Sequence, residues 1–212
     1  MIDVTVAMHR GMVVWPGDPP FSDELWNDLG EGFEATMRRL SLSTHTGTHL
    51  DAPSHVIAEG GGVDSVPLSY LVGPVAVVDT GHVRCITQED LERLLPDEVP
   101  PRILFKTRNS HRRLIDEPCF IEDFVALDPS AAQWLVNHGI KVVGIDYYSV
   151  DVFHSSGYPA HCILLQSGVA VIEAVRLVDV KPGVYRLIAL PLKLLGMDGS
   201  PLRVILENLE KD

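Results

Sequence analysis

The sequence has little cysteine and no cysteine pattern. Its 212 residues include three cysteines, Cys85, Cys119 and Cys162, which lie far apart and form no CxxC pair. Such isolated cysteines argue against a disulfide framework and against a zinc knuckle, so we expect reduced thiols. The first twelve residues also lack the basic and apolar regions of a secretory signal. Both observations predict a cytoplasmic protein.

Positive charge is scarce as well. The chain has 17 Lys and Arg against 29 Asp and Glu, a formal net charge of −12 with neutral histidines. Proteins that bind nucleic acid neutralise phosphates with clustered Lys and Arg, and an anionic membrane surface repels an acidic chain. We therefore expect neither nucleic acid nor a membrane as a partner. No run of about 18 uncharged apolar residues occurs, which excludes a membrane-spanning helix.

Several catalytic signatures are missing. The sequence contains no GxSxG elbow, no P-loop, no GxGxxG and no HExxH. The glycines at 60–62 follow no expected strand and lack the Lys-Ser/Thr of a phosphate-binding loop. These absences argue against a serine hydrolase elbow, a nucleotide cradle and a helical zinc site.

The remaining pattern is that of a globular α/β protein. Hydrophobic residues make up 46% and charged residues 22% of the chain, and the length suits one domain spanning 1–212. We expect a mixed sheet with flanking helices, because some strands follow one another without a helix. Strands are expected at 2–7, 36–44, 74–79, 102–107, 141–146, 169–173, 185–191 and 203–207, and helices begin at Thr87, Asp128 and Pro159.

The densest functional signal lies between residues 43 and 55. It has the form H-x3-H-x-D-x3-H, with His45, His49, Asp51 and His55 at the polar positions. Gly47 and Pro53 oppose a helix, and in an extended chain odd-numbered residues share one face. Imidazole and carboxylate without thiolate suit Zn²⁺, Mn²⁺ or Fe²⁺ in a centre with open positions. The alternative is a set of histidines that only form hydrogen bonds.

A second pair, His161 and Glu173, gives a weaker signal. The helix beginning at Pro159 and the strand 169–173 allow the two side chains to meet. A carboxylate that follows an apolar strand is costly to bury unless it is paired or binds a metal. A salt bridge from Glu173 to Arg176 or another base is the competing explanation, and the residues alone leave both open.

The segment His45–His55 resembles the HTGTHxDAPxH signature of the cyclase family of metal-dependent hydrolases, which includes bacterial kynurenine formamidase and isatin hydrolase. The similarity continues along most of the chain, at 14–18, 144–151, 161–173, 190–193 and 199–201. It implies a swivelling β/β/α fold, usually assembled as a homodimer.

The resemblance also implies a set of site residues. His45, His49 and Asp51 would bind a first metal, and His161 a second, with Asp51 and Glu173 bridging the two. His55 would donate and accept protons, and Trp15 would line the substrate pocket. We expect one or two divalent ions per subunit, Zn²⁺ as in the formamidases or Mn²⁺ as in isatin hydrolase. Asp146 and Asp151 either position the site or cap a loop.

The implied function is hydrolysis of an amide-type bond in a small molecule, with N-formylkynurenine converted to kynurenine and formate. The metal would make hydroxide available at neutral pH, and His55 would move the proton. Thr48 and Ser54 stand where formamidases often carry alanine and a bulkier apolar residue, so we expect them to reshape the pocket. A cyclic amide or lactone hydrolase of the same family is one alternative. A non-catalytic metal-binding or ligand-binding protein is another.

Overall fold

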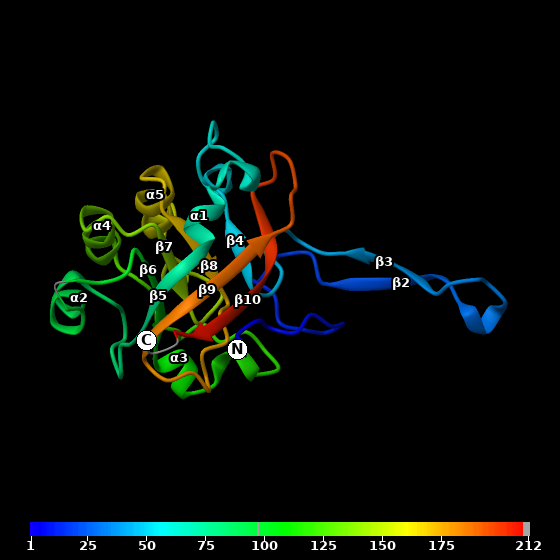
Figure 1. The fold of residues 1–212 in the computed structure, drawn as a ribbon, viewed down its shortest axis with the longest axis horizontal. Coiled ribbons are helices and arrows are strands. Elements are labelled where there is room, and N and C mark those ends of the chain that lie inside the picture. Colours follow the sequence, from blue (N-terminus) through cyan, green and yellow to red (C-terminus); the bar gives the residue numbers. More distant parts are fainter. Residues whose placement is uncertain (97, 210–212) are drawn as a thin grey trace.

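A mixed eight-stranded sheet organises the chain in the computed structural model (Figure 1). The structure describes residues 1–96 and 98–209; Asp97 and residues 210–212 of the expected domain 1–212 lie outside the described residues. The strands are β1 (Ile2–Asp3), β4 (His49–Asp51), β5 (Val72–Asp79), β6 (Arg102–Lys106), β7 (Val142–Ile145), β8 (Ala170–Glu173), β9 (Gly183–Pro191) and β10 (Gly199–Asn208). Their order is β1-β10-β4-β8-β7-β6-β5-β9, and a further β9–β10 pairing closes the sheet into a barrel.

Strands β5 to β8 run parallel, and β4, β9 and β10 are antiparallel to their neighbours. The parallel strands are buried on both faces, which explains their continuous apolar sequences. Leu104 and Val142 pack in one core with Leu50. Phe105 and Val143 belong to a second core, which lies between the sheet and the helices.

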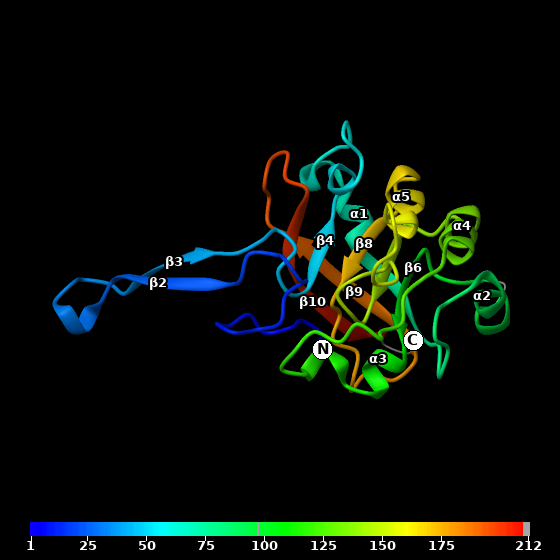
Figure 2. The ribbon, with the colours of Figure 1, turned by 180° about the vertical axis from the view of Figure 1, so that it is seen from behind.

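Three helices cover the outer face of the parallel strands (Figure 2). They are α2 (Gln88–Leu94), α4 (Pro129–Asn137) and α5 (Pro159–Gln166); α1 (Leu68–Leu71) and α3 (Arg108–His111) are single turns. Thr87 forms the expected capping box of α2, and the Asp128 side chain caps α4. The α/β class with a mixed sheet and flanking helices is therefore confirmed. Among the described residues, no helix is both long and apolar enough to cross a membrane.

A two-stranded arm projects from this body (Figures 1 and 2). It consists of β2 (Ser22–Asn27) and β3 (Met37–Ser41), which among the described residues pair only with each other. The strand expected at 36–44 from the alternation around Leu40 is present as β3, but its predicted half-burial is wrong, because every residue of β3 is exposed. Strand β2 was not expected, and the strand predicted at 2–7 covers only residues 2–3.

Candidate metal centre and active site

The central strand of the site is β4, which lies between β8 and β10. Its register places His49 opposite Glu173 and Asp51 opposite Gly199. The expectation that the whole stretch from His45 is extended is wrong. Only 49–51 form a strand, and His45 comes from the preceding turn, where Gly47 adopts a φ of +65°. The turn still brings His45 to Asp51, because a glycine adopts this left-handed conformation without strain.

Two carboxylates lie between three histidines. Oδ1 of Asp51 is 2.9 Å from His45 Nδ1 and 3.2 Å from His49 Nε2, and its Oδ2 is 3.4 Å from His161 Nε2. Glu173 repeats the pattern, with Oε2 3.5 Å from His49 Nε2 and Oε1 3.1 Å from His161 Nε2. Each carboxylate thus directs one oxygen towards His49 and the other towards His161. This is the arrangement that two bridging ligands require.

The other nitrogen of each of these histidines is held by an acceptor. His45 Nε2 donates to Asp198 at 2.9 Å, His49 Nδ1 to the Gly47 carbonyl at 2.8 Å, and His161 Nδ1 to Asp151 at 2.6 Å. Such contacts fix the tautomer and the orientation of a metal-binding imidazole. They leave Nδ1 of His45 facing Asp51, and Nε2 of His49 and of His161 facing both carboxylates.

The donor set fits divalent cations. The side chains of His49, Asp51, His161 and Glu173 are at most 5% exposed, and His49 Nε2 and Asp51 Oδ2 are buried without a hydrogen-bond partner. Unpaired buried polar atoms and adjacent buried carboxylates are costly unless a cation lies between them. Two groups, His45–Asp51–His55 and His49–Asp51–Glu173, have ligand atoms close enough to share an ion. All five predicted ligands are brought together here.

The pKa values of the residues at the centre reflect the cost of burying adjacent charges. Burial lowers the pKa of His45, but hydrogen bonds and charge from Asp51 and Asp198 outweigh it and raise the pKa to about 9. Burial, together with the neighbouring charge of Asp51, raises the pKa of Glu173. For Asp51 the surrounding histidines outweigh burial and hold its pKa well below the usual range. In the metal-free site, protons on the histidines supply the positive charge that the carboxylates need.

His55 differs from the other three histidines. It lies in the short turn Pro53–His55 after β4, its side chain is 30% exposed, and its ring is 4.0 Å from that of His45. Its nearest carboxylate is Asp198, 3.9 Å away, which is too far for a hydrogen bond. Burial and the neighbouring histidines lower its pKa to about 4. His55 is therefore a neutral imidazole with a free nitrogen beside the centre.

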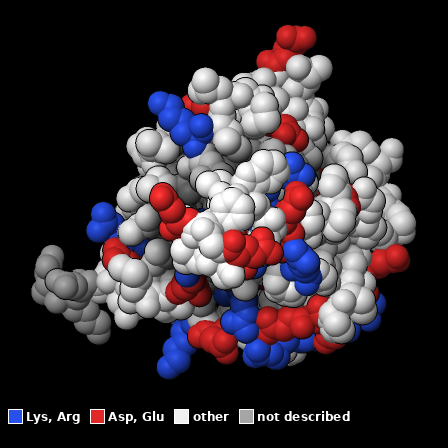
Figure 3. Space-filling model, turned by 90° about the vertical axis from the view of Figure 1, so that its right-hand side faces the viewer, with Lys and Arg blue, Asp and Glu red and all other residues white. Residues whose placement is uncertain are grey.

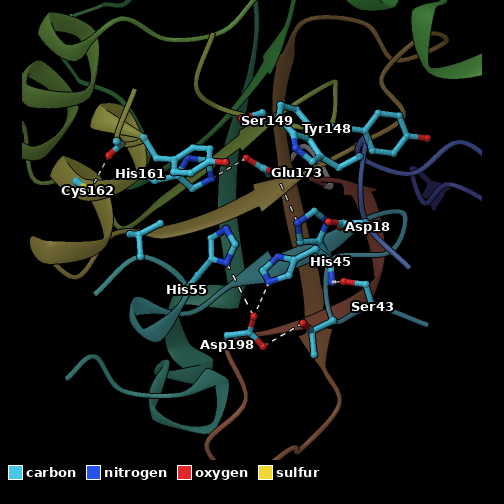
Figure 4. Close-up of a pocket in the computed structure, with 16 residues that line it drawn as sticks. Asp18, Ser43, His45, His55, Tyr148, Ser149, His161, Cys162, Glu173 and Asp198 are labelled. Atoms are coloured by element: carbon cyan, nitrogen blue, oxygen red, sulfur yellow. Dashed lines mark hydrogen bonds and ion pairs between the residues drawn. The ribbon is translucent and has the colours of Figure 1, made fainter. Parts of the chain in front are cut away.

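These residues line a cavity of about 590 Å³ (Figure 4). Trp15 forms part of its wall, and edge contacts with Phe120 and Phe153 hold the indole in place. Thr48 and Ser54 do not line the cavity. Thr48 is fully buried and its hydroxyl donates to the Ala174 carbonyl, so the expectation that it reshapes the pocket is wrong.

The structure also decides between the alternatives that the sequence left open for Glu173, Asp146 and Asp151. Arg176 pairs with Asp116 and Asp179, so the proposed salt bridge to Glu173 is wrong. Asp146 is fully buried and accepts hydrogen bonds from Thr107, Asn109 and Ser110, which is a structural role near α3. Asp151 positions the site.

Asp151 also caps α5. Its carboxylate accepts from the backbone N–H groups of Ala160 and His161 as well as from the His161 ring.

Sequence reasoning missed Asp198 and the role of Gly199. Gly199 is opposite Asp51 in the β10–β4 register, and a Cβ at this position would lie 2.9 Å from His45 Cε1. A side chain here would displace the imidazole. Asp198, one residue earlier, accepts from His45 and from the Thr44 hydroxyl. The dipeptide is 147 residues beyond Asp51 in the chain, and no local pattern connects the two.

Comparison with known proteins agrees with this geometry. Residues 2–152, more than half of the chain, match the model of the Cyclase family, described as "Putative cyclase". The chain belongs to the cyclase family.

Solved structures of similar fold include a "potential metal-dependent hydrolase with cyclase activity", 36% identical, with a TM-score of 0.84 over 99% of this chain and 98% of the other. A "predicted metal-dependent hydrolase" from Bacillus stearothermophilus is 37% identical, with a TM-score of 0.81 over 97% and 96%. Isatin hydrolase A from Labrenzia aggregata, bound to benzyl benzoate, is 27% identical, with a TM-score of 0.81 over 99% and 93%.

Asp151 offers a test of metal affinity in this cyclase-family centre. Asp151→Asn removes the charge that holds the His161 ring, and loss of such a partner costs about 10–100-fold in metal affinity or activity. We expect titration with a competing chelator to show weaker binding of one ion, with the fold unchanged by circular dichroism. Unchanged affinity would show that the ring is oriented by its burial alone.

Proposed function

We propose that this cyclase-family protein is a metal-dependent hydrolase of amide-type bonds in small molecules, closest in activity to an arylformamidase. The observation that carries the proposal is the pair of carboxylates Asp51 and Glu173, each placed between His49 and His161, beside the neutral imidazole of His55. N-formylkynurenine is the proposed substrate, and formate and the aryl amine are the products.

The proposed roles follow from the positions of the side chains. His45, His49 and Asp51 would hold one divalent ion and His161 a second, with Asp51 and Glu173 shared. When bound, such a centre activates water and polarises a carbonyl oxygen. His55 accepts the proton of the attacking water and returns it to the leaving nitrogen. Trp15 presents an indole surface against which an aryl ring stacks.

The substrate panel decides between this function and its alternatives. We expect the metal-loaded protein to hydrolyse N-formylkynurenine faster than isatin or simple lactones. Faster turnover of isatin would favour the cyclic amide hydrolase, an alternative supported by the similarity to isatin hydrolase A. Metal binding without turnover of any member would favour a non-catalytic metal-binding protein. We propose Zn²⁺ as the native metal and Mn²⁺ as the alternative, because nitrogen and oxygen ligands suit both.

We also propose a cytoplasmic location, supported by three free cysteines.

We propose that the protein is a homodimer held by the arm. An isolated two-stranded hairpin is at best marginally stable in water, yet within residues 1–96 and 98–209 the arm pairs with no other strand. Its apolar side chains are 41–60% exposed; they are Leu25, Trp26, Leu29, Phe33, Met37 and Leu40. If areas of about 150–250 Å², as for aromatic side chains, are used for these residues, the six side chains together expose on the order of 600 Å² of apolar surface. A stable interface buries roughly 800 Å² per partner.

The second surface of this interface is on the same chain. The end of β9 and the β9–β10 connection expose Leu190, Leu192, Leu195 and Met197. In a dimer with a twofold axis, the arm of each copy would cover the exposed apolar residues near the β9–β10 connection of the other copy. This arrangement gives a closed dimer. On the face viewed in Figure 3, acidic and basic side chains are mixed around uncharged surface. A second copy that approaches this face therefore encounters charges of both signs, and not a surface of negative charge alone.

Substitution of the arm tests the dimer. Trp26→Ser together with Phe33→Ser removes two aromatic contacts, and we expect a monomer by light scattering at micromolar concentration. Leu68→Ser, at an equally exposed position on α1 (62%), is the control and leaves the dimer intact. A dimer that survives the arm substitutions, or a monomeric parent protein, would contradict the proposal.

A further inference from the structure

We propose that Asp18 makes the active-site cavity a charge filter, which admits neutral and cationic aryl amides and excludes anionic ones. The inference rests on the proposed function, because it names the substrate class of the same site. It follows from the charges of the cavity wall and not from the identity of any one substrate.

The cavity wall, in the part of the chain that the structure describes, has no lysine or arginine to meet an anion. None of its lining residues is Lys or Arg, whereas Asp18, Glu173 and Asp198 all line it. Asp51 lies directly behind them, within 3.2 Å of His49. Two divalent cations would only balance these four carboxylates, and a single cation would leave a net charge of −2. A substrate anion therefore finds no net attraction in the cavity that holds two cations. With a single cation the remaining negative charge repels the anion, and a low-dielectric wall strengthens this repulsion.

Asp18 is the carboxylate of this wall that is left without a partner. Asp198 accepts hydrogen bonds from Thr44 and His45, and Glu173 accepts one from the Val150 N–H. By contrast, within residues 1–96 and 98–209 the structure shows no hydrogen bond or ion pair of the Asp18 side chain. Its charge is free to act on a bound molecule.

The backbone fixes Asp18 relative to the aromatic wall. Its N–H donates to the Trp15 carbonyl at 3.0 Å, so the indole and the carboxylate belong to one turn. Tyr148 and Tyr158 are the other aromatic residues of the wall (Figure 4). Burial raises the pKa of Tyr148, so this ring stays neutral. An aryl group stacked on Trp15 would therefore have its substituents close to the Asp18 charge.

The same charges favour release of the product. Hydrolysis adds water across the C–N bond, so the acyl carbon leaves as a carboxylic acid and the nitrogen as an amine. The acid ionises at neutral pH and becomes an anion in a cavity whose described wall has no lysine or arginine.

A series of para-substituted formanilides tests the filter. The neutral member is 4-(methylsulfonyl)formanilide, the anion is 4-formamidobenzenesulfonate, and the cation is 4-(aminomethyl)formanilide. Sulfonate is chosen over carboxylate because it is a weak metal ligand. We expect kcat/KM for the neutral compound to exceed that for the anion by about tenfold or more. The cation should react at least as well as the neutral compound.

Asp18→Asn removes the charge and retains the size of the side chain. We expect this variant to reduce the neutral-to-anion ratio by about threefold or more, mainly through KM. The control is Glu89→Gln, which changes the net charge equally but lies in the first turn of α2, outside the cavity; it should leave the ratio unchanged.

Each result decides the proposal. A parent protein that uses the anion as well as the neutral compound overturns it, as does an Asp18→Asn ratio equal to that of the parent. If no member of the series reacts, the proposed arylformamidase activity fails. The charge-filter proposal is then tested by calorimetry, which measures how tightly the same compounds bind to the metal-loaded protein. Binding of the anion as tight as that of the neutral compound would overturn it.

Discussion

Replacing His55 with alanine will lower turnover by about a hundredfold or more while leaving the metal centre filled. The reason is its position: the imidazole is 30% exposed to the cavity, has no hydrogen-bonded carboxylate, and its pKa of about 4 keeps it neutral. Such a group accepts a proton from water without giving up a metal. The measurement is steady-state hydrolysis together with metal content by elemental analysis.

Two further variants separate proton transfer from other roles of His55. His55→Gln keeps a polar side chain of similar reach but transfers no proton at neutral pH, so it should be as slow as the alanine variant. His82→Ala changes an exposed histidine outside the cavity and should have no effect. Loss of metal from His55→Ala would instead make His55 a ligand, as its grouping with His45 and Asp51 allows.

Asp51→Asn will abolish both metal binding and turnover. This carboxylate is fully buried and faces His45 and His49 with one oxygen and His161 with the other. An amide supplies one neutral oxygen in place of two charged ones and cannot bridge two ions. We expect the metal content of the purified variant to fall below one-tenth of that of the parent and hydrolysis to fall to background.

Asp146→Asn is the matched control for Asp51→Asn. Asp146 is equally buried but lies outside the cavity and accepts its hydrogen bonds from the segment around α3. We expect a lower melting temperature and normal metal content. If Asp146→Asn lost metal to the same extent, metal loss in Asp51→Asn would report general damage to the fold.

The buried strands could be predicted because their sequences determine them. The apolar run around Val75 and the run 102–107 are buried on both faces, and the caps at Thr87 and Asp128 fix where helices begin. The arm could not be predicted in the same way. The alternation around Leu40 resembles that of a strand facing a core, and a single chain gives no sign that the partner surface lies outside it.

The candidate site, like the fold, could be predicted only in part from the sequence. Neighbouring residues such as His45, His49 and Asp51 could be connected by spacing, because a few residues of backbone join them. Asp198 could not, since the strand register brings it to His45 from 153 residues further along the chain. Asp151 is only ten residues from His161, but its contact with that ring depends on the N-terminus of α5, and the sequence left its role open. Long-range pairing is decided by the closed sheet, and local pattern does not encode it.

Stepwise reconstitution of the metal-free protein tests the central claim most directly. The protein is stripped with a chelator and titrated with Zn²⁺ or Mn²⁺ while hydrolysis of N-formylkynurenine and of the formanilide series is followed. We predict no turnover without metal and a rise that saturates at one or two equivalents per chain, in step with bound metal. Equal turnover by the metal-free and the loaded protein would contradict a metal-dependent hydrolase.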